Sequence, residues 1–218
     1  MEPRTDPDRA GSYLRSLAPD LPQFLADLEE KCFREYVSVI RKGTQSVIRC
    51  MLALKRPERI LEIGTGIGFS ASFMAEYSGA EIITIEHAPD RIREAGEVLS
   101  ASPHAGRIRL IGGEAEDILP KLTGTFDLVF MDAAKGQYGA MLHDVLNLLA
   151  PGGLLITDNV LQEGSLIDSH YLIERRDRTI HKRMREYLET LMHHPELTTT
   201  ILTEGDGMAL SVKYIKKA

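Results

Sequence analysis

Two patterns of hydrophobic residues divide the chain. In the first quarter, residues 21–36 and 44–55 place hydrophobic side chains at helical spacing, and a short connection joins these two predicted helices. From residue 59 onward, short and nearly uninterrupted hydrophobic runs alternate with longer helical segments, as in a parallel sheet that helices cover on both faces. The predicted strands are 59–63, 81–86, 107–112, 126–132 and 154–159, and the predicted helices between and after them are 69–78, 88–102, 113–122 and 135–150.

The end of the chain departs from this alternation. A basic helix at about 175–194 precedes two more predicted strands, 197–203 and 208–215. Asp206-Gly207 between these strands is a strong turn signal, so we expect an antiparallel hairpin. The pattern therefore predicts an α/β fold with a seven-stranded, mostly parallel sheet that ends in this hairpin. This is the Rossmann-like architecture of class I S-adenosylmethionine-dependent methyltransferases.

Length and composition fit one domain, with N-terminal helices at 1–55 and the Rossmann-like core at 56–218. The 218 residues, of which 43% are hydrophobic and 27% charged, can bury a sizeable core. No apolar run approaches the roughly 20 residues that a membrane-spanning helix needs, and the polar start does not resemble a signal peptide. Cys32 and Cys50 are expected to be reduced packing residues, so we expect a cytoplasmic protein without a membrane partner.

Charge is distributed unevenly along the chain. The net charge is −6, yet residues 175–185 carry six Arg or Lys side chains and one Asp. An acidic body with one dense basic stretch favours a localised anionic partner over general polyanion affinity. A solvated helix face or a contact between subunits would explain the same stretch.

Oxygen-bearing side chains stand at the ends of two predicted strands. Asp132 follows one strand, Asp158-Asn159 ends the next, and Lys135 lies three residues after Asp132. The carboxyl ends of parallel strands meet at one edge of the sheet, where α/β proteins bind their ligands. Three such oxygens suit a hard divalent cation such as Mg²⁺. Alternatively, Asp132 caps the following helix and Asp158-Asn159 are turn residues.

A glycine-rich loop follows the first predicted strand. Gly64, Gly66 and Gly68 form a GxGxG pattern, whereas the dinucleotide-binding pattern GxGxxG requires glycine where Phe69 stands. Glycines let the backbone turn sharply and approach a ligand closely. The spacing argues against a pyrophosphate ligand.

Two acids after later strands fit a nucleoside-bearing ligand. Glu86 ends the second strand at the position where nucleotide-binding folds place an acid that accepts hydrogen bonds from the ribose hydroxyls. Glu114 follows the third strand, where an adenine would lie. A solvated strand-end carboxylate and a first-turn helix acid are the plain alternatives for these two residues.

Four segments together resemble a known family. LEIGTGIGFSA, TIEHAPDR, FDLVFMDAAKGQY and GGLLITDNVLQEG are similar to the cation-dependent O-methyltransferases related to catechol and caffeoyl-CoA methyltransferases. The resemblance covers about residues 35–218 and implies S-adenosyl-L-methionine as methyl donor and Mg²⁺ or Mn²⁺ as cation. The matches at the two strand ends are more specific than the glycine loop.

The resemblance also implies roles for individual residues. The metal ligands would be Asp132, Asp158 and Asn159. Lys135 matches a lysine proposed as general base, so the expected catalytic residues are Lys135 and Asp132. The cation would lower the pKa of a substrate hydroxyl, and Lys135 would accept the proton before the oxygen attacks the methyl group. The donor site would be lined by Ile40, Gly64, Ser70, Glu86, Glu114 and Asp132.

The C-terminal part is most similar to a subgroup, the bacterial tRNA 5-hydroxyuridine methyltransferases. RRDRTIHKRMREYLETLMHHP and TTTILTEGDGMALSVK carry this similarity, which implies methylation of the wobble uridine 5-hydroxyl in tRNA. Basic side chains at phosphates strengthen binding by releasing counterions. The candidate RNA contacts are Arg175, Arg176, Arg178, Lys182 and Arg183.

Two other functions stay open. One is methylation of a small catechol-like or acyl-CoA phenol, with the arginines holding an anionic substrate. The other is a non-catalytic nucleotide-binding or RNA-binding module, against which the complete acid–amide set argues. His181, His193 and His194 lack a zinc-binding spacing and are taken as surface or helix-end residues, and we expect a homodimer.

Overall fold

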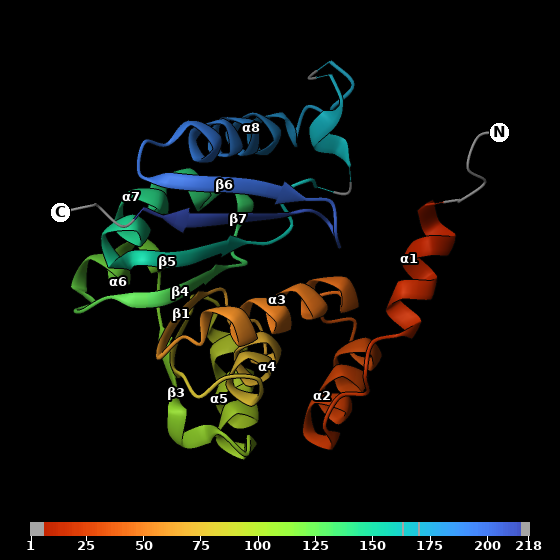
Figure 1. Cartoon of the computed structure of the whole chain (residues 1–218), viewed down its shortest axis with the longest axis vertical. Coiled ribbons are helices and arrows are strands. Elements are labelled where there is room, and N and C mark those ends of the chain that lie inside the picture. Colours follow the sequence, from red (N-terminus) through yellow and green to blue (C-terminus); the bar gives the residue numbers. More distant parts are fainter. Residues whose placement is uncertain (1–6, 163, 170, 215–218) are drawn as a thin grey trace.

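The computed structural model describes residues 7–162, 164–169 and 171–214. One seven-stranded sheet runs through the molecule in the order β3-β2-β1-β4-β5-β7-β6 (Figure 1). Neighbours from β3 to β5 pair in parallel, whereas β7 is antiparallel to both β5 and β6, which confirms the predicted hairpin. The strands are β1 Arg59–Ile63, β2 Glu81–Glu86, β3 Ile108–Gly112, β4 Phe126–Met131, β5 Leu149–Thr157, β6 Leu197–Leu202 and β7 Met208–Lys213.

Helices pack on both faces of the sheet, because successive strand residues point to opposite faces and both sets are hydrophobic. Leu61 and Val129 pack with α7 and α8 in one core, whereas Ile60 and Leu128 pack with α2, α3 and α4 in the other. The predicted α/β fold is therefore confirmed. The helices are α1 Pro7–Ser16, α2 Gln23–Arg34, α3 Lys42–Lys55, α4 Phe69–Glu76, α5 Pro89–Ala101, α6 Ala115–Ile118, α7 Tyr138–Leu148 and α8 Arg178–His193.

Several predicted boundaries were wrong. The helix expected at 113–122 is one α-helical turn followed by the 3₁₀ helix Leu119–Lys121, because Pro120 has no N–H to continue the helix. Strand β5 begins at Leu149, where it pairs with Phe126, and ends before Asp158. Helix α8 begins at Arg178, three residues later than expected.

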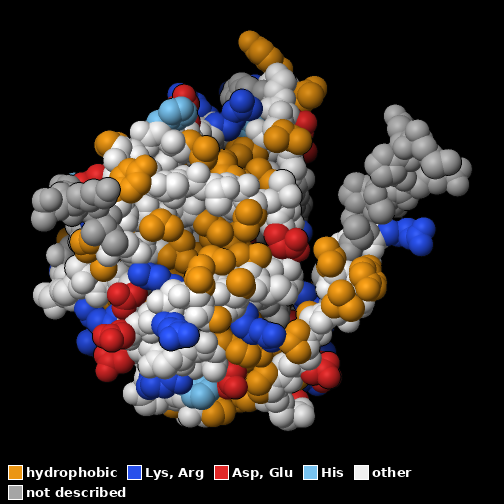
Figure 2. All heavy atoms as spheres, viewed as in Figure 1, with side chains coloured by type: hydrophobic (Ala, Val, Ile, Leu, Met, Phe, Trp, Pro, Cys, Tyr) orange, Lys and Arg blue, Asp and Glu red, His pale blue; other side chains and the backbone are white. Residues whose placement is uncertain are grey.

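One face of the molecule carries hydrophobic side chains over the middle of the sheet and along α3 (Figure 2). Leu54 of α3 and Val212 of β7 are among the exposed hydrophobic residues of these elements. Cys32 and Cys50 are free thiols, as predicted. Cys32 is buried, but Cys50 is exposed on α3, so its assignment as a packing residue was wrong. Within the described ranges, none of the helices combines the length and apolar character needed to span a bilayer.

Candidate active site

The ends of strands β1, β2, β4 and β5 bring the predicted site residues together. Backbone hydrogen bonds continue past each strand: Asp132 N donates to Ile63 O at 2.9 Å, and Asp158 N donates to Met131 O at 3.0 Å. On the other side of β1, Gly64 N donates to Ile85 O at 2.9 Å. These bonds fix the first residue after each strand, so the predicted acids and glycines share one edge of the sheet.

Asp132, Asp158 and Asn159 form the expected cluster of oxygen donors. Asn159 Nδ2 donates to Asp132 Oδ1 at 3.0 Å, and Asn159 N donates to Asp158 Oδ1 at 2.9 Å. Asn159 has φ +58°, a left-handed conformation that asparagine tolerates better than most residues. That backbone conformation turns the chain just after the strand and presents the amide beside Asp132.

The two carboxylates of this cluster are poorly solvated. Asp158 is 2% exposed, and burial, followed by the charge of Asp132, raises its pKa to about 7. Burial also raises the pKa of Asp132, against the hydrogen bond from Asn159 and the charge of Lys135. A bound cation would stabilise the ionised form of Asp158, which burial and the neighbouring Asp132 disfavour.

The donor set fits a hard divalent cation. Among the described residues, no group of three or more His, Cys, Asp or Glu side chains could hold a metal ion. The cluster has only two carboxylates, and its third oxygen donor is the amide of Asn159. The amide oxygen of Asn159 reaches the position of its nitrogen by rotating the group half a turn. Asp132, Asp158 and Asn159 would then be the residues that hold Mg²⁺ or Mn²⁺.

Lys135 stands at the edge of this cluster. It begins the 3₁₀ helix Lys135–Gln137, and its Nζ lies 3.5 Å from Asp206 Oδ2 at the tip of the β6–β7 hairpin. Asp206 in turn accepts a backbone hydrogen bond from Leu161 N at 2.9 Å, two residues after Asn159, so Lys135 lies beside the cluster. The structure therefore brings the predicted general base and the predicted metal ligands together.

Two adjoining hollows of about 200 and 210 Å³ lie along the glycine loop. Gly64, Gly66 and Asp132 line both of them. A Cβ on Gly64, whose φ is +99°, would overlap the carbonyl oxygen of Asp132, so only glycine fits there. All six predicted donor-site residues line one or both hollows: Ile40, Gly64, Ser70, Glu86, Glu114 and Asp132.

Glu86 is held by the backbone around it. Its Oε2 accepts from Gly66 N at 2.9 Å, and its Oε1 accepts from His87 N and Ala88 N, both at 3.0 Å. The carboxylate is buried at the wall of one hollow and keeps lone pairs for further donors. Glu114, in contrast, is an exposed residue immediately before α6.

Some residues at these hollows were not found from the sequence. Gln137 and His87 line the hollow beside Glu86, and Ser38 lines the other. Glu62, directly before the glycine loop, is fully buried, accepts a hydrogen bond from Thr84 and has its pKa raised to about 8, mainly by burial. Because β1 is a hydrophobic run buried on both faces, the sequence could have identified Glu62 within it as a buried acid.

A larger hollow of about 510 Å³ has Lys135 in its lining. It is formed by the irregular segment after β5 and the start of α8, and we call it the acceptor hollow after the role proposed for it below. Its lining residues are Lys135, Gln162, Ser165, Asp168, Leu172, Ile173, Glu174, Asp177 and Ile180.

None of the predicted RNA contacts lines the acceptor hollow, but Arg175, Arg176 and Arg178 are next in sequence to its lining residues Glu174 and Asp177. Arg175 and Arg176 are exposed and precede α8, and Arg176 pairs with Glu174 at 3.1 Å. Arg183 Nη1 donates to Gly136 O at 3.2 Å, which places this side chain beside the Lys135 turn. Arg178 Nε donates to Ile173 O at 3.0 Å, and the exposed Lys182 pairs with Glu186 at 3.7 Å.

The histidines follow the prediction only in part. His181 is 2% exposed, so its assignment as a surface residue was wrong; it lies on the face of α8 that packs against the sheet. His193 ends α8 and is exposed, as expected.

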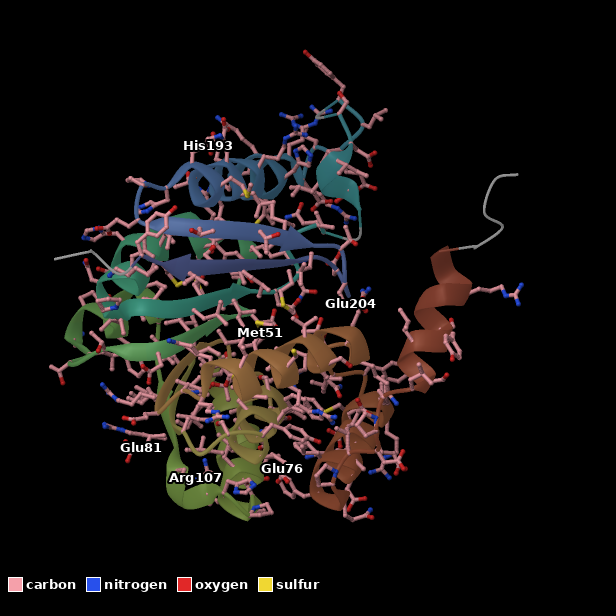
Figure 3. The ribbon with its side chains drawn as sticks, in the orientation of Figure 1. Met51, Glu76, Glu81, Arg107, His193 and Glu204 are labelled. Carbon is pink, nitrogen blue, oxygen red and sulfur yellow. The ribbon has the colours of Figure 1, made fainter. Side chains whose placement is uncertain are left out.

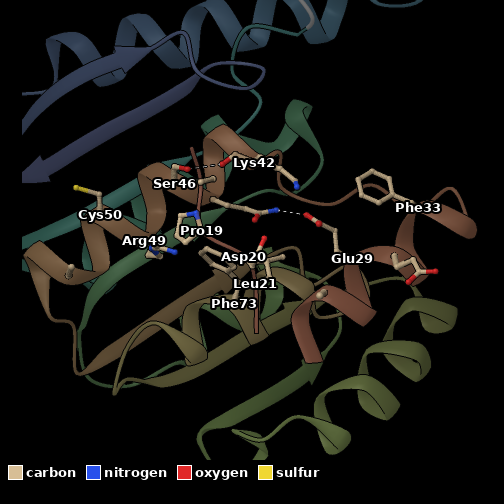
Figure 4. A pocket seen from close by; sticks show the side chains of 15 residues that line it. Pro19, Asp20, Leu21, Glu29, Phe33, Lys42, Ser46, Arg49, Cys50 and Phe73 are labelled. Carbon is tan, nitrogen blue, oxygen red and sulfur yellow. Dashed lines mark hydrogen bonds between the residues drawn. The ribbon is translucent and has the colours of Figure 1, made fainter. Parts of the chain in front are cut away.

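Another hollow, larger than the three described above, lies elsewhere. It has a volume of about 720 Å³ and opens between α2 and α3, with Glu29, Lys42 and Arg49 on its walls (Figure 4). Glu29 accepts a hydrogen bond from Gln45 there. This hollow shares no lining residue with the donor hollows or the acceptor hollow.

Known proteins resemble this chain over nearly its full length. Residues 15–214 match the family described as O-methyltransferase. A catechol O-methyltransferase of Mycobacterium tuberculosis is 31% identical, covering 97% of this chain and 98% of that protein. A catechol O-methyltransferase of Niastella koreensis is 30% identical, covering 76% of this chain and 77% of that protein.

Solved structures resemble it as closely. A Staphylococcus aureus protein described as a caffeoyl-CoA O-methyltransferase has a TM-score of 0.88 and 31% identity, covering 94% of this chain and 100% of that chain. A Podospora anserina methyltransferase, solved with S-adenosylhomocysteine, has a TM-score of 0.84 and 27% identity, covering 99% of both chains.

Proposed function

This chain belongs to the O-methyltransferase family, and we propose that it methylates the 5-hydroxyl of the wobble 5-hydroxyuridine in tRNA to give 5-methoxyuridine. The methyl donor is S-adenosylmethionine, and Mg²⁺ or Mn²⁺ is held by Asp132, Asp158 and Asn159. One observation carries the proposal: Asp132 lines both donor hollows, and Lys135 lines a larger acceptor hollow with basic side chains at its border. The reacting groups thus lie where donor and acceptor would meet.

The donor assignment is supported by shape and by hydrogen-bonding capacity. Glu86, fixed by three backbone N–H groups, accepts from the ribose hydroxyls. The hollow that contains Ser70 and Ile40 takes the methionine part, and the hollow that contains Glu114 takes the adenine. A relative at 27% identity was solved with S-adenosylhomocysteine, the product of such a donor.

The chain's own groups account for the steps of methyl transfer. A divalent cation, when bound, supplies Lewis-acid chemistry that lowers the pKa of the acceptor hydroxyl. Lys135, as the neutral amine, takes the hydroxyl proton and becomes an ammonium. The acceptor oxygen then attacks the methyl carbon in line, the carbon–sulfur bond breaks, and S-adenosylhomocysteine leaves. Holding both reactants at the sheet edge provides much of the rate gain.

The acceptor assignment is supported by size and charge. A hollow of about 510 Å³ has room for a nucleoside. Asp168, Glu174 and Asp177 line it and disfavour a phosphate inside, whereas Arg175 and Arg176 beside it suit backbone phosphates at its border. An RNA loop with one base turned into the hollow satisfies both conditions.

A small catechol-like or acyl-CoA phenol is the second candidate acceptor. The observation that favours it is the 31% identity to a catechol O-methyltransferase over 97% of the chain. The arginines would then hold an anionic group of the substrate.

Nucleoside analysis separates the two candidates. We expect a deletion strain to lose 5-methoxyuridine and accumulate 5-hydroxyuridine in its tRNA. The purified protein should methylate an anticodon stem-loop that carries 5-hydroxyuridine, but not the same RNA with uridine. Unchanged 5-methoxyuridine in the deletion strain, together with methylation of a catechol, would instead establish the small-phenol enzyme.

A further inference from the structure

The tip of the β6–β7 hairpin carries a buried carboxylate beside Lys135. Asp206 Oδ2 lies 3.5 Å from Lys135 Nζ, and the Asp206 side chain is 5% exposed, against 32% for Lys135. The pair is separated by 71 residues in sequence, so only the hairpin brings the two together. None of the steps described above gives Asp206 a task.

Backbone hydrogen bonds join this tip to the segment that follows the metal-ligand residues. Leu161 N donates to Asp206 O at 2.9 Å, and Val160 N donates to Gly207 O at 3.0 Å. A Cβ on Gly207 would overlap the Leu161 side chain, so a glycine is needed for this close approach. The position of Asp206 is therefore tied to that of Asp158 and Asn159.

The opposite side of the tip packs against the start of α3. Figure 3 places Glu204 close to the N-terminal end of α3, and its carboxylate occupies the space that a side chain on Gly43 would need. Arg41, immediately before α3, donates through Nη1 to Gly205 O at 3.5 Å. The tip is thus held between α3 and the residues after β5.

We propose that Asp206 is a positioning residue that holds the Lys135 amine beside the acceptor hydroxyl. A lysine has four rotatable side-chain bonds, and ordering them costs conformational entropy. A fixed carboxylate supplies one preferred position for the nitrogen and pairs with the ammonium that forms when the proton arrives. The inference rests on the proposed role of Lys135 as proton acceptor.

A double-mutant cycle tests this inference. Wild type, Asp206→Asn, Lys135→Met and the double variant are compared for kcat, acceptor KM and affinity for S-adenosylhomocysteine. We expect Asp206→Asn to lower kcat about 10- to 100-fold, as a small misplacement of a catalytic group does, with KM and S-adenosylhomocysteine affinity nearly unchanged. In the Lys135→Met background, the same change should cost less than about twofold in kcat.

Controls separate positioning from support of the fold. Asp206→Glu keeps the carboxylate and should recover part of kcat, whereas Glu94→Gln removes the carboxylate of a remote ion pair with Arg91 and should leave kcat unchanged. An equal loss of kcat from Asp206→Asn in both backgrounds overturns the inference, as does full activity of Lys135→Met. If the wild type methylates a catechol and no RNA, the substrate proposal fails, and the same cycle with the catechol still decides the role of Asp206.

Discussion

On the donor side of the active site, Glu86 accepts hydrogen bonds from three backbone N–H groups and Gly64 lies against the Asp132 carbonyl. On the acceptor side, most of the lining comes from side chains of the irregular segment between β5 and α8. Exposed hydrophobic residues are common in that segment, including Ile167 at 80%, Tyr171 at 87% and Leu172 at 76%. The donor side is therefore built mainly from backbone and the acceptor side mainly from exposed side chains.

This difference separates what the two sides can do. A donor site built from strand ends and backbone contacts keeps its shape as long as the sheet keeps its structure. Such a site suits a ligand that all members of a family bind. An acceptor site on an irregular segment can change by substitution without disturbing the core. Substitutions on the two sides should accordingly have different effects, and the following predictions test that expectation.

The largest effect is expected where the two sides meet. Asp158→Ala removes a buried carboxylate of the cation site, and turnover should fall by more than the ~100-fold that loss of an outer-shell partner costs. Calorimetry should show that Mn²⁺ binding is lost in parallel, and the circular dichroism spectrum should show that the fold is retained. Asp117→Ala, which removes an exposed acid of α6, serves as control. Full turnover of Asp158→Ala in the presence of EDTA would exclude the cation role.

The next effect tests the donor side alone. Gly64→Ala should weaken S-adenosylhomocysteine binding at least ~100-fold, because the added Cβ overlaps the Asp132 carbonyl and the backbone has φ +99°. Calorimetry measures the S-adenosylhomocysteine affinity, and the melting temperature reports any loss of stability. Gly79→Ala is the matched control, since its Cβ would meet no atom within 4 Å. Normal binding by Gly64→Ala would show that the backbone on the donor side is less constrained than the contact indicates.

The donor side and the sheet could be predicted because their signals are local in sequence. Hydrophobic runs gave the strands, and Gly64, Glu86, Asp132 and Asp158 each stand at or just after a strand end. Parallel pairing then brings them together, whatever the details of packing.

The acceptor side could not be predicted in the same way. Asp206 reaches Lys135 from 71 residues away through hairpin packing, which no spacing rule reveals. The helix start was placed at 175 instead of Arg178 because the basic run continues across the boundary. His181 was predicted to be a surface or helix-end residue because it lacks a zinc-binding spacing, yet its position on α8 faces the core.

A smaller effect is expected from the acceptor side. Arg175→Ala with Arg176→Ala should weaken binding of the anticodon stem-loop about tenfold at moderate salt. Removing two phosphate contacts should also lower the slope of log K against log salt by about 1.4. S-adenosylhomocysteine affinity should not change. The double variant Arg91→Ala with Arg93→Ala removes the same charge from α5, far from the acceptor hollow, so an equal loss of RNA affinity in both variants would refute a specific role.

The smallest effect concerns the pH dependence of stability on the donor side. Burial raises the pKa of Glu62 to about 8 from an ordinary value of 4.5, so the folded protein keeps a proton that the unfolded chain releases. The contribution of this group to stability is therefore present below about pH 4.5 and is lost as the pH rises toward 8. Glu62→Gln cannot titrate at this position. In the absence of methyl donor, the melting temperature of the variant minus that of wild type should therefore increase by a few degrees between pH 5 and 8.

Glu81→Gln, which alters an exposed carboxylate of the adjacent strand β2 (Figure 3), should give a melting curve against pH parallel to wild type. Parallel curves for Glu62→Gln and wild type would mean that Glu62 is ionised within the sheet. The donor side would then rest on a buried charge as well as on backbone contacts, and its contrast with the acceptor side would be smaller. A difference in melting temperature that grows with rising pH would support a neutral Glu62 carboxyl group. A neutral carboxyl group explains how β1 can bury an acid just before the glycine loop without an opposing charge.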